Sequence, residues 1–318
     1  MVTRREAVCA AINHQDTGHL PYTIGFTGPA AEALSAHYGT SDLDAAIGNC
    51  MSRIGGPWWE FVNPPDDQLA PDPPSRLPDI RGTGSYTELC DNIARLRETT
   101  DRFILVQYYA SLFEKAWFLR GMENLMCDMI RHPDYCEALF ERIVTADLNT
   151  LEMMLSADVD GVLLGSDWGS QHALMMSPEH WRRLLRPRYA RMFRVIRDSG
   201  KYAFLHSCGN IFVVLPEVVE MGVQVLNPVQ PECMDIAEIK ARFGDKLAFW
   251  GGISTQQTLP MGSPADVRRE TREVAAVLGA GGGYILAPAQ EIQEDVPLAN
   301  CLALIEEAQA LFAGLGRS

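Results

Sequence analysis

Short apolar runs recur along the chain, and each one ends in glycine or in polar residues. Between these runs lie longer segments with apolar residues at helical spacing, such as residues 134–155 and 264–279. This repeated order of buried strand, polar loop and helix predicts parallel strands joined by right-handed crossovers. The predicted strands, of which the second has the weakest pattern, are at residues 20–26, 50–54, 103–109, 161–165, 202–206, 223–226, 247–250 and 284–287.

About eight β/α units in 318 residues are typical of a (β/α)8 TIM barrel, whose active site lies at the carboxyl ends of the strands. A doubly wound open sheet is the alternative. Such a sheet usually has a glycine-rich phosphate loop after its first strand, whereas residues 26–30 read Phe-Thr-Gly-Pro-Ala. The predicted fold is therefore a single α/β TIM-barrel domain over residues 1–318, with an N-terminal helical extension. A Pro/Gly-rich insertion near 55–85 is expected to fold over or beside the barrel mouth.

The composition restricts the ligand classes. A formal net charge of -14 argues against nucleic acid, because phosphate binding needs a basic surface. No apolar run approaches the roughly 20 residues of a membrane span, and the amino terminus does not have the pattern of a signal peptide. A cytoplasmic protein with small-molecule or protein partners is expected. The oligomeric state is left open, with a homodimer among the alternatives.

The clearest chemical motif is His206-Ser207-Cys208, which directly follows a predicted strand. Two ligands spaced two residues apart in an extended segment point the same way and can bind one cation. Zinc is the first candidate because it accepts mixed nitrogen and sulfur ligands. The alternative is a packed core histidine beside a buried free cysteine, since the eight cysteines include no C-x-x-C pair.

Polar and aromatic residues also follow the other predicted strands, and we expect them on the same face of the barrel. Asp167 and Gln171 are the candidates for orienting substrate or transferring protons, as catalytic residues. Neutral side chains able to hold an oxygenated substrate, with two aromatic residues that could line its pocket, form the predicted substrate-binding set: Asn227, Gln230, Gln256, Trp168 and Trp250.

Four motifs in order resemble the uroporphyrinogen decarboxylase superfamily, and within it the cobalamin-dependent methyltransferase branch. The motifs are His206-Ser207-Cys208-Gly209-Asn210, Asn227-Pro228-Val229-Gln230-Pro231, Trp250-Gly251-Gly252-Ile253 and the run from Gly281 to Pro288. The resemblance extends over nearly the whole chain and implies a TIM barrel.

Two departures from the family pattern bear on function. The loop after the first predicted strand has no arginine, whereas the true decarboxylases use arginines there to grip porphyrin carboxylates. Methyltransferase relatives bind zinc through His-x-Cys and a later cysteine, but this chain has Pro288-Ala289-Gln290-Glu291 at the later position. Gln290 takes the aligned place, and Glu291 is the better ligand because carboxylates bind zinc. Either residue could therefore complete the metal ligands, or the site could be weakened or lost.

The resemblance implies a zinc-dependent methyltransferase that moves a methyl group between a small, O-methylated substrate and a corrinoid (cobalamin). The corrinoid is expected on a separate partner protein, because the chain contains no D-x-H-x-x-G motif. With fewer thiolate ligands the zinc would be more electrophilic and would suit an oxygen-linked methyl donor. Two alternatives remain: a cofactor-independent decarboxylase of a carboxylated substrate, and a non-catalytic binding barrel.

Overall fold

The computed structural model describes residues 2–56, 59–62, 72–74, 77–82 and 86–314. The chain divides into two compact units. Unit 1 comprises residues 1–52, 100–104 and 224–318, and unit 2 comprises residues 53–99 and 105–223. Strands β1 (Met51–Gly55) and β4 (Phe103–Tyr108) each begin in unit 1 and end in unit 2.

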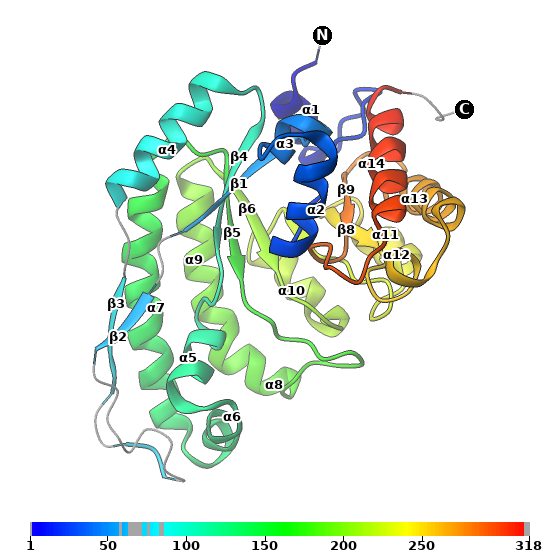
Figure 1. The fold of residues 1–318 in the computed structure, drawn as a ribbon. Helices are drawn as coiled ribbons and strands as arrows, with labels where there is room; N and C mark the ends of the chain where they lie inside the picture. Colours follow the sequence, from blue (N-terminus) through cyan, green and yellow to red (C-terminus); the bar gives the residue numbers. More distant parts are fainter. Residues whose placement is uncertain (1, 57–58, 63–71, 75–76, 83–85, 315–318) are drawn as a thin grey trace. The chain divides into compact units, whose positions relative to one another are not determined.

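Unit 2 contains β5, β6 and the part of β4 from Leu105 onwards, which run parallel and lie side by side (Figure 1). Its helices α7 and α9 pack against each other. The remaining bounds in this unit are β2 (Trp59–Val62), β3 (Asp79–Gly82), α4 (Tyr86–Thr99), α5 (Phe113–Arg120), α6 (Met122–Arg131), α7 (Pro133–Leu155), β5 (Gly161–Gly165), α8 (Pro178–His180), α9 (Arg186–Asp198), β6 (Tyr202–His206) and α10 (Leu215–Glu220).

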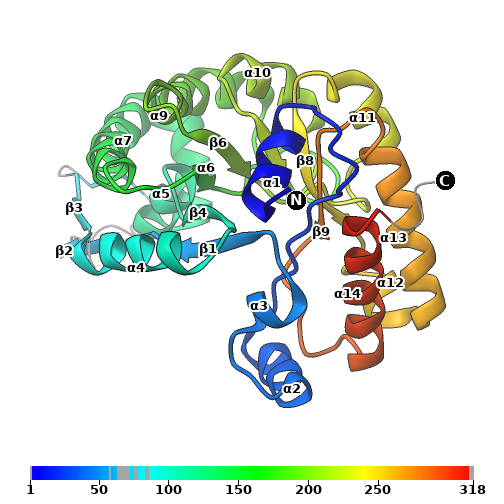
Figure 2. The ribbon, with the colours of Figure 1, turned by 90° about the horizontal axis from the view of Figure 1, so that it is seen from above.

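Unit 1 contains β7, β8 and β9, also parallel, and a pair of long helices, α13 and α14, that lie side by side (Figure 2). The Arg272 guanidinium donates to both carboxylate oxygens of Glu307 and so links these two helices. The bounds in this unit are α1 (Arg4–Ile12), α2 (Gly28–Tyr38), α3 (Leu43–Ile47), β7 (Val225–Asn227), α11 (Ile236–Phe243), β8 (Ala248–Ile253), α12 (Thr258–Met261), α13 (Pro264–Leu278), β9 (Tyr284–Pro288) and α14 (Leu298–Phe312).

The alternation of strand and helix confirms the predicted α/β class, and the buried strands match the apolar runs. Strands β5 and β6 span the predicted 161–165 and 202–206, and every residue of β5 is buried. The weakest prediction, 50–54, corresponds to β1. Burial on both faces is what parallel strands covered by helices require, which explains why these segments are continuously apolar.

The first predicted strand, residues 20–26, is wrong as a regular strand. Tyr22 and Phe26 make only isolated parallel bridges, to Leu286 and Ile292. The side chain of Asn49 replaces part of the missing ladder, because it accepts from the N–H of Ile24 and donates to the carbonyl of the same residue.

Two further segments contain elements that the sequence analysis did not predict. Within the 55–85 insertion, β2 and β3 pair antiparallel, and β3 packs beside α7. Most of the rest of that insertion lies outside the described residues. Its predicted position over or beside the barrel mouth therefore stays a prediction. A π-helical segment, Trp181–Leu185, directly precedes α9. Pro187 lies in the first turn of α9, just after this segment, and because proline has no N–H it cannot donate the usual hydrogen bond to the preceding helical turn.

None of the helices among the described residues is long and apolar enough to cross a membrane.

Candidate functional site

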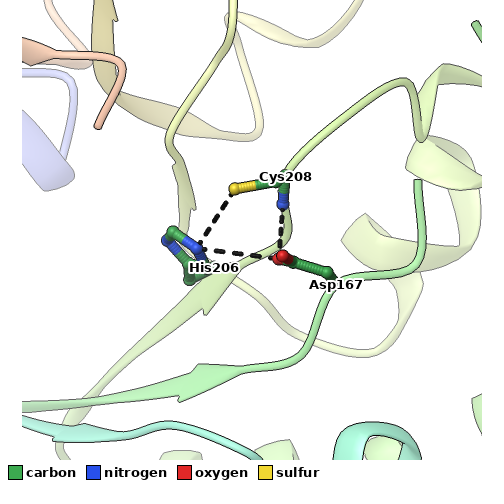
Figure 3. A group of neighbouring side chains, drawn as sticks. All are labelled: Asp167, His206 and Cys208. Carbon is green, nitrogen blue, oxygen red and sulfur yellow. Dashed lines mark hydrogen bonds and ion pairs between the residues drawn. The ribbon is translucent and has the colours of Figure 1, made fainter. Parts of the chain in front are cut away.

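The loops that leave β5 and β6 bring Asp167, His206 and Cys208 together (Figure 3). In the parallel pair, Gly165 lies opposite His206. Asp167 is two residues past Gly165 and Cys208 is two residues past His206, so the two loops present these side chains at the same sheet edge. His206 is the last residue of β6 and is buried.

The donor atoms of this cluster are close to one another. The Nε2 atom of His206 lies 3.5 Å from the Sγ atom of Cys208 and 3.7 Å from Oδ1 of Asp167. All three ligand atoms lie within 4.8 Å of one another. The backbone N–H of Cys208 donates to Oδ1 of Asp167 at 2.8 Å, and this bond fixes the carboxylate beside the thiol.

Backbone contacts lock the two loops together. Gly209 has φ +78°, and a Cβ atom at this position would lie 2.5 Å from the carbonyl carbon of Gly169, so only glycine permits this approach. The N–H of Asn210 donates to the carbonyl of Ser170 at 2.8 Å. The N–H of Trp168 donates to the Ser207 hydroxyl at 3.0 Å. The cluster is therefore held by backbone on both sides.

Tyr109, at the exit of β4, forms one wall of the cluster. Its ring meets the His206 imidazole edge to face, with 5.1 Å between the ring centroids. The same ring lies over Gly165, where a Cβ atom would be only 2.3 Å from it. Gly165 thus leaves room for an aromatic side chain that is 40% exposed and borders the candidate ligands.

Glu114 is a candidate residue that the sequence analysis missed. It lies in the first turn of α5 and accepts hydrogen bonds from the backbone of Asp167 and Ala110. Burial, followed by repulsion from the Asp167 carboxylate, raises the pKa of Glu114 to about 7. The sequence offered little signal, because an acid in the first turn of a helix is ordinarily read as favourable to the helix dipole.

A buried charged network supports the β4–α5 loop. Asp147 on α7 forms an ion pair with Lys115 on α5, and both side chains are almost completely buried. Asp147 also accepts from the Tyr108 hydroxyl at 2.8 Å and from the N–H of Leu112 at 3.0 Å. Leu112 has φ +36°, a conformation that L residues rarely adopt, so Asp147 holds a strained backbone in place.

The other two predicted site residues of unit 2 are Trp168 and Gln171. Trp168 is fully buried and packs against Trp181 and Tyr189, with ring centroids 5.2 and 4.8 Å away. Its side chain is thus part of the core, although its backbone belongs to the site loop. Gln171 is exposed at the tip of this loop, in a turn closed by the hydrogen bond from the N–H of Ser170 to the carbonyl of Ala173.

The remaining candidates belong to unit 1. Asn227 ends β7 and is buried, and its amide donates to the carbonyl of Trp250, which is also buried. The turn that follows contains the cis peptide bond between Asn227 and Pro228 and packs directly on Gly251. The other members are half-buried or exposed at their strand exits: Gln230, Gln256, Gln290 and Glu291.

The Asp167, His206 and Cys208 cluster fits a zinc ion. Two ligands bonded at about 2.0–2.3 Å to a tetrahedral ion lie about 3.3–3.8 Å apart. The 3.5 and 3.7 Å separations from Nε2 of His206 are within that range. The donor set of imidazole, thiolate and carboxylate is one that zinc accepts, and three protein ligands leave a position open for chemistry.

Comparison with known proteins identifies the family. A model of the uroporphyrinogen decarboxylase (URO-D) family matches residues 63–311, which is most of the chain. The chain belongs to the URO-D family. This result confirms the superfamily that the four sequence motifs indicated.

One URO-D relative and two solved structures are similar to this chain in sequence or in fold. The uroporphyrinogen decarboxylase of Actinobacillus succinogenes is 23% identical over 172 residues, which are 54% of this chain and 47% of that relative. The match thus spans about half of the relative's length. A methyltransferase from Methanosarcina mazei has a TM-score of 0.74 at 18% identity and covers 98% of this chain and 100% of its own. A D-psicose 3-epimerase from Clostridium cellulolyticum has a TM-score of 0.47 at 12% identity, covering 92% and 94% of the two chains.

The family match and the methyltransferase fold confirm the predicted TIM-barrel type of α/β fold. The family match supports an enzyme of the URO-D type.

Proposed function

We propose that this chain is a zinc-dependent methyltransferase that transfers a methyl group between a small O-methylated substrate and a corrinoid carried by a separate protein. The observation that supports it most directly is the imidazole, thiolate and carboxylate group at the exits of β5 and β6. A decarboxylase that needs no metal can use the imidazole and the carboxylate as acid and base, but it has no evident role for the thiolate. The fold similarity to a methyltransferase over nearly the whole chain is consistent with this choice.

His206 and Cys208 are the residues that would hold zinc, together with a carboxylate. Zinc would supply a Lewis acid that stabilises negative charge on the atom from which the methyl group leaves. The buried His206 needs no rearrangement to act as a ligand, because β6 ends on it and the Tyr109 ring packs against it. This preorganisation reduces the cost of assembling the site.

The chain's other residues would bind and orient the methyl donor. Tyr109, partly exposed beside His206, offers an aromatic surface for it. The sequence assigns neutral polar side chains at further strand exits to the donor's oxygen atoms: Asn227, Gln230 and Gln256. It assigns Gln171 to orienting the substrate or transferring protons. These assignments remain predictions. The corrinoid is assigned to a partner because the sequence contains no D-x-H-x-x-G segment.

The test is incubation of the zinc-loaded protein with Co(I) cobalamin and a panel of methoxylated and methylamine compounds. Methylcobalamin, detected by its absorbance, is the expected product. Cys208→Ser should lose this activity, whereas Cys90→Ser is the matched control, because Cys90 is a similarly half-buried thiol on α4. Absence of methylcobalamin across the panel, together with carbon dioxide release from a carboxylated substrate, would overturn the proposal in favour of a decarboxylase.

A further inference from the structure

We infer that Asp167 supplies the third protein ligand of the metal site, in place of the predicted Gln290 or Glu291. The site would then be built entirely from the exits of β5 and β6, with one nitrogen, one sulfur and one oxygen ligand. This inference concerns the metal centre of the proposed function and rests on it.

The position of the Asp167 carboxylate is the first argument. Its Oδ1 atom lies 3.7 Å from Nε2 of His206 and accepts the N–H of Cys208 at 2.8 Å. A carboxylate oxygen has more than one lone pair, so the same atom can keep this hydrogen bond and bind a cation. The hydrogen bond also orients the ligand, as supporting contacts around metal ligands commonly do. The Asp167 side chain is 32% exposed, so the cluster is accessible to an entering ion.

The rigidity of the frame is the second argument. The parallel register of β5 and β6 sets the distance between Asp167 and the His-x-Cys segment. The close approach of Gly209 to Gly169 fixes the same distance from the loop side. Ligands on strand ends that are locked in this way keep their geometry better than ligands on independent loops.

Gln290 is chemically the poorer candidate, and Glu291, although a carboxylate, is more exposed than Asp167. Both side chains are exposed, and the Gln290 amide oxygen accepts the N–H of Glu291 at 3.2 Å. A neutral amide is a poorer zinc ligand than a carboxylate and brings no charge to the site. With Asp167 as ligand, one thiolate and one carboxylate balance the two positive charges of the cation, so no further anionic ligand is needed.

The ligand set also predicts the class of metal. One thiolate and one imidazole favour Zn²⁺ or Co²⁺ over the hard cations Mg²⁺ and Ca²⁺, which prefer sites made of oxygen atoms. Co²⁺ is therefore the useful spectroscopic probe, since it takes the same ligands and reports thiolate coordination by its absorbance.

The test is zinc affinity of the metal-stripped full-length protein, measured by competition with a chromophoric chelator. Asp167→Asn keeps an oxygen that can accept the N–H of Cys208 but removes the anionic ligand, so affinity should fall by about 100-fold or more. The double variant Gln290→Ala/Glu291→Gln should bind zinc as the unmodified protein does. Asp167→Cys should restore affinity and strengthen the thiolate-to-cobalt band of the Co²⁺ form, because a second sulfur joins the ligands.

The outcomes separate the ligand assignment from the proposed function. If Asp167→Asn binds zinc normally while the Gln290/Glu291 variant does not, the assignment is overturned. Unchanged affinity in all variants also overturns it. If the variants behave as expected and methyl transfer is nonetheless absent, the ligand assignment stands and only the proposed function fails. Circular dichroism of each variant confirms that it is folded.

Discussion

Removing the negative charge of Asp147 should destabilise the protein by about 3–5 kcal/mol, the usual cost of leaving one partner of a buried ion pair uncompensated. Asp147→Asn preserves the shape of the side chain. Its remaining oxygen can still accept the N–H of Leu112, which the Asp147 carboxylate binds at 3.0 Å. What is lost is the charge opposite Lys115, whose side chain is 1% exposed and therefore has almost no access to water.

A double-mutant cycle, measured by chemical denaturation at neutral pH, separates the interaction between Asp147 and Lys115 from the other effects of each substitution. Lys115→Met alone should cost a similar amount, because it strands the carboxylate. The double variant Asp147→Asn/Lys115→Met should lose much less than the sum, with a coupling free energy of about 2–3 kcal/mol. The surface pair of Arg242 and Glu238, with side chains 51% and 54% exposed, is the control. Glu238→Gln should cost less than about 1 kcal/mol. Additive losses for the buried pair, or a loss from Asp147→Asn no larger than that of Glu238→Gln, would refute the reasoning.

Three further outcomes follow from the structure. Gly209→Ala should lower the melting temperature and zinc affinity together, because its Cβ atom would meet the neighbouring loop at 2.5 Å; normal zinc affinity in this variant would contradict the locking role. Trp168→Ala should cost about 3–5 kcal/mol in denaturant unfolding, as truncation of a fully buried aromatic does, and a loss below about 1 kcal/mol would contradict its core position. Asp266, in the capping box of α13, has a pKa lowered to about 2 by hydrogen bonds from Ser263 and Arg269. Its stabilisation is present above its unfolded pKa near 3.8 and declines as pH falls towards 2, so Asp266→Ala should lower the melting temperature at pH 6 and less so at pH 3. A fall in melting temperature that is larger at pH 3 than at pH 6 would contradict this prediction.

Much of the fold could be predicted because the buried parallel strands leave a strong apolar signal. Residues 161–165 and 202–206 are strands on both the sequence and the structural evidence. Residues 20–26 have the same apolar character but form only isolated bridges. Side-chain pattern reports burial, and it does not report whether the backbone hydrogen bonds are made by a neighbouring strand or by a side chain such as Asn49.

The sequence identified the residues of the candidate site better than it identified their roles. Asp167, His206 and Cys208 were all identified as strand-exit residues, but their mutual distances depend on the register of β5 and β6, which the sequence does not state. Asp167 was therefore predicted to position substrate, and its place within 3.7 Å of His206 came only from the structure. Glu114 was missed for a related reason, since its raised pKa depends on burial and on Asp167, which is distant in sequence.

The residue at position 167 also bears on the kind of methyl donor. A carboxylate is a harder ligand than a thiolate and donates less electron density to the cation, so a set with one thiolate leaves the cation more electrophilic than a set with two. An electrophilic centre suits an oxygen that must take up negative charge as the methyl group leaves, whereas a thiol acceptor already forms a stable thiolate with less help. Asp167 is held by the N–H of Cys208 at the β5 and β6 exits. With the proposed zinc ion bound there, this bias towards oxygen would be built into unit 2. The proposed preference for an O-methylated substrate would thus rest on the same carboxylate that is proposed to complete the metal site.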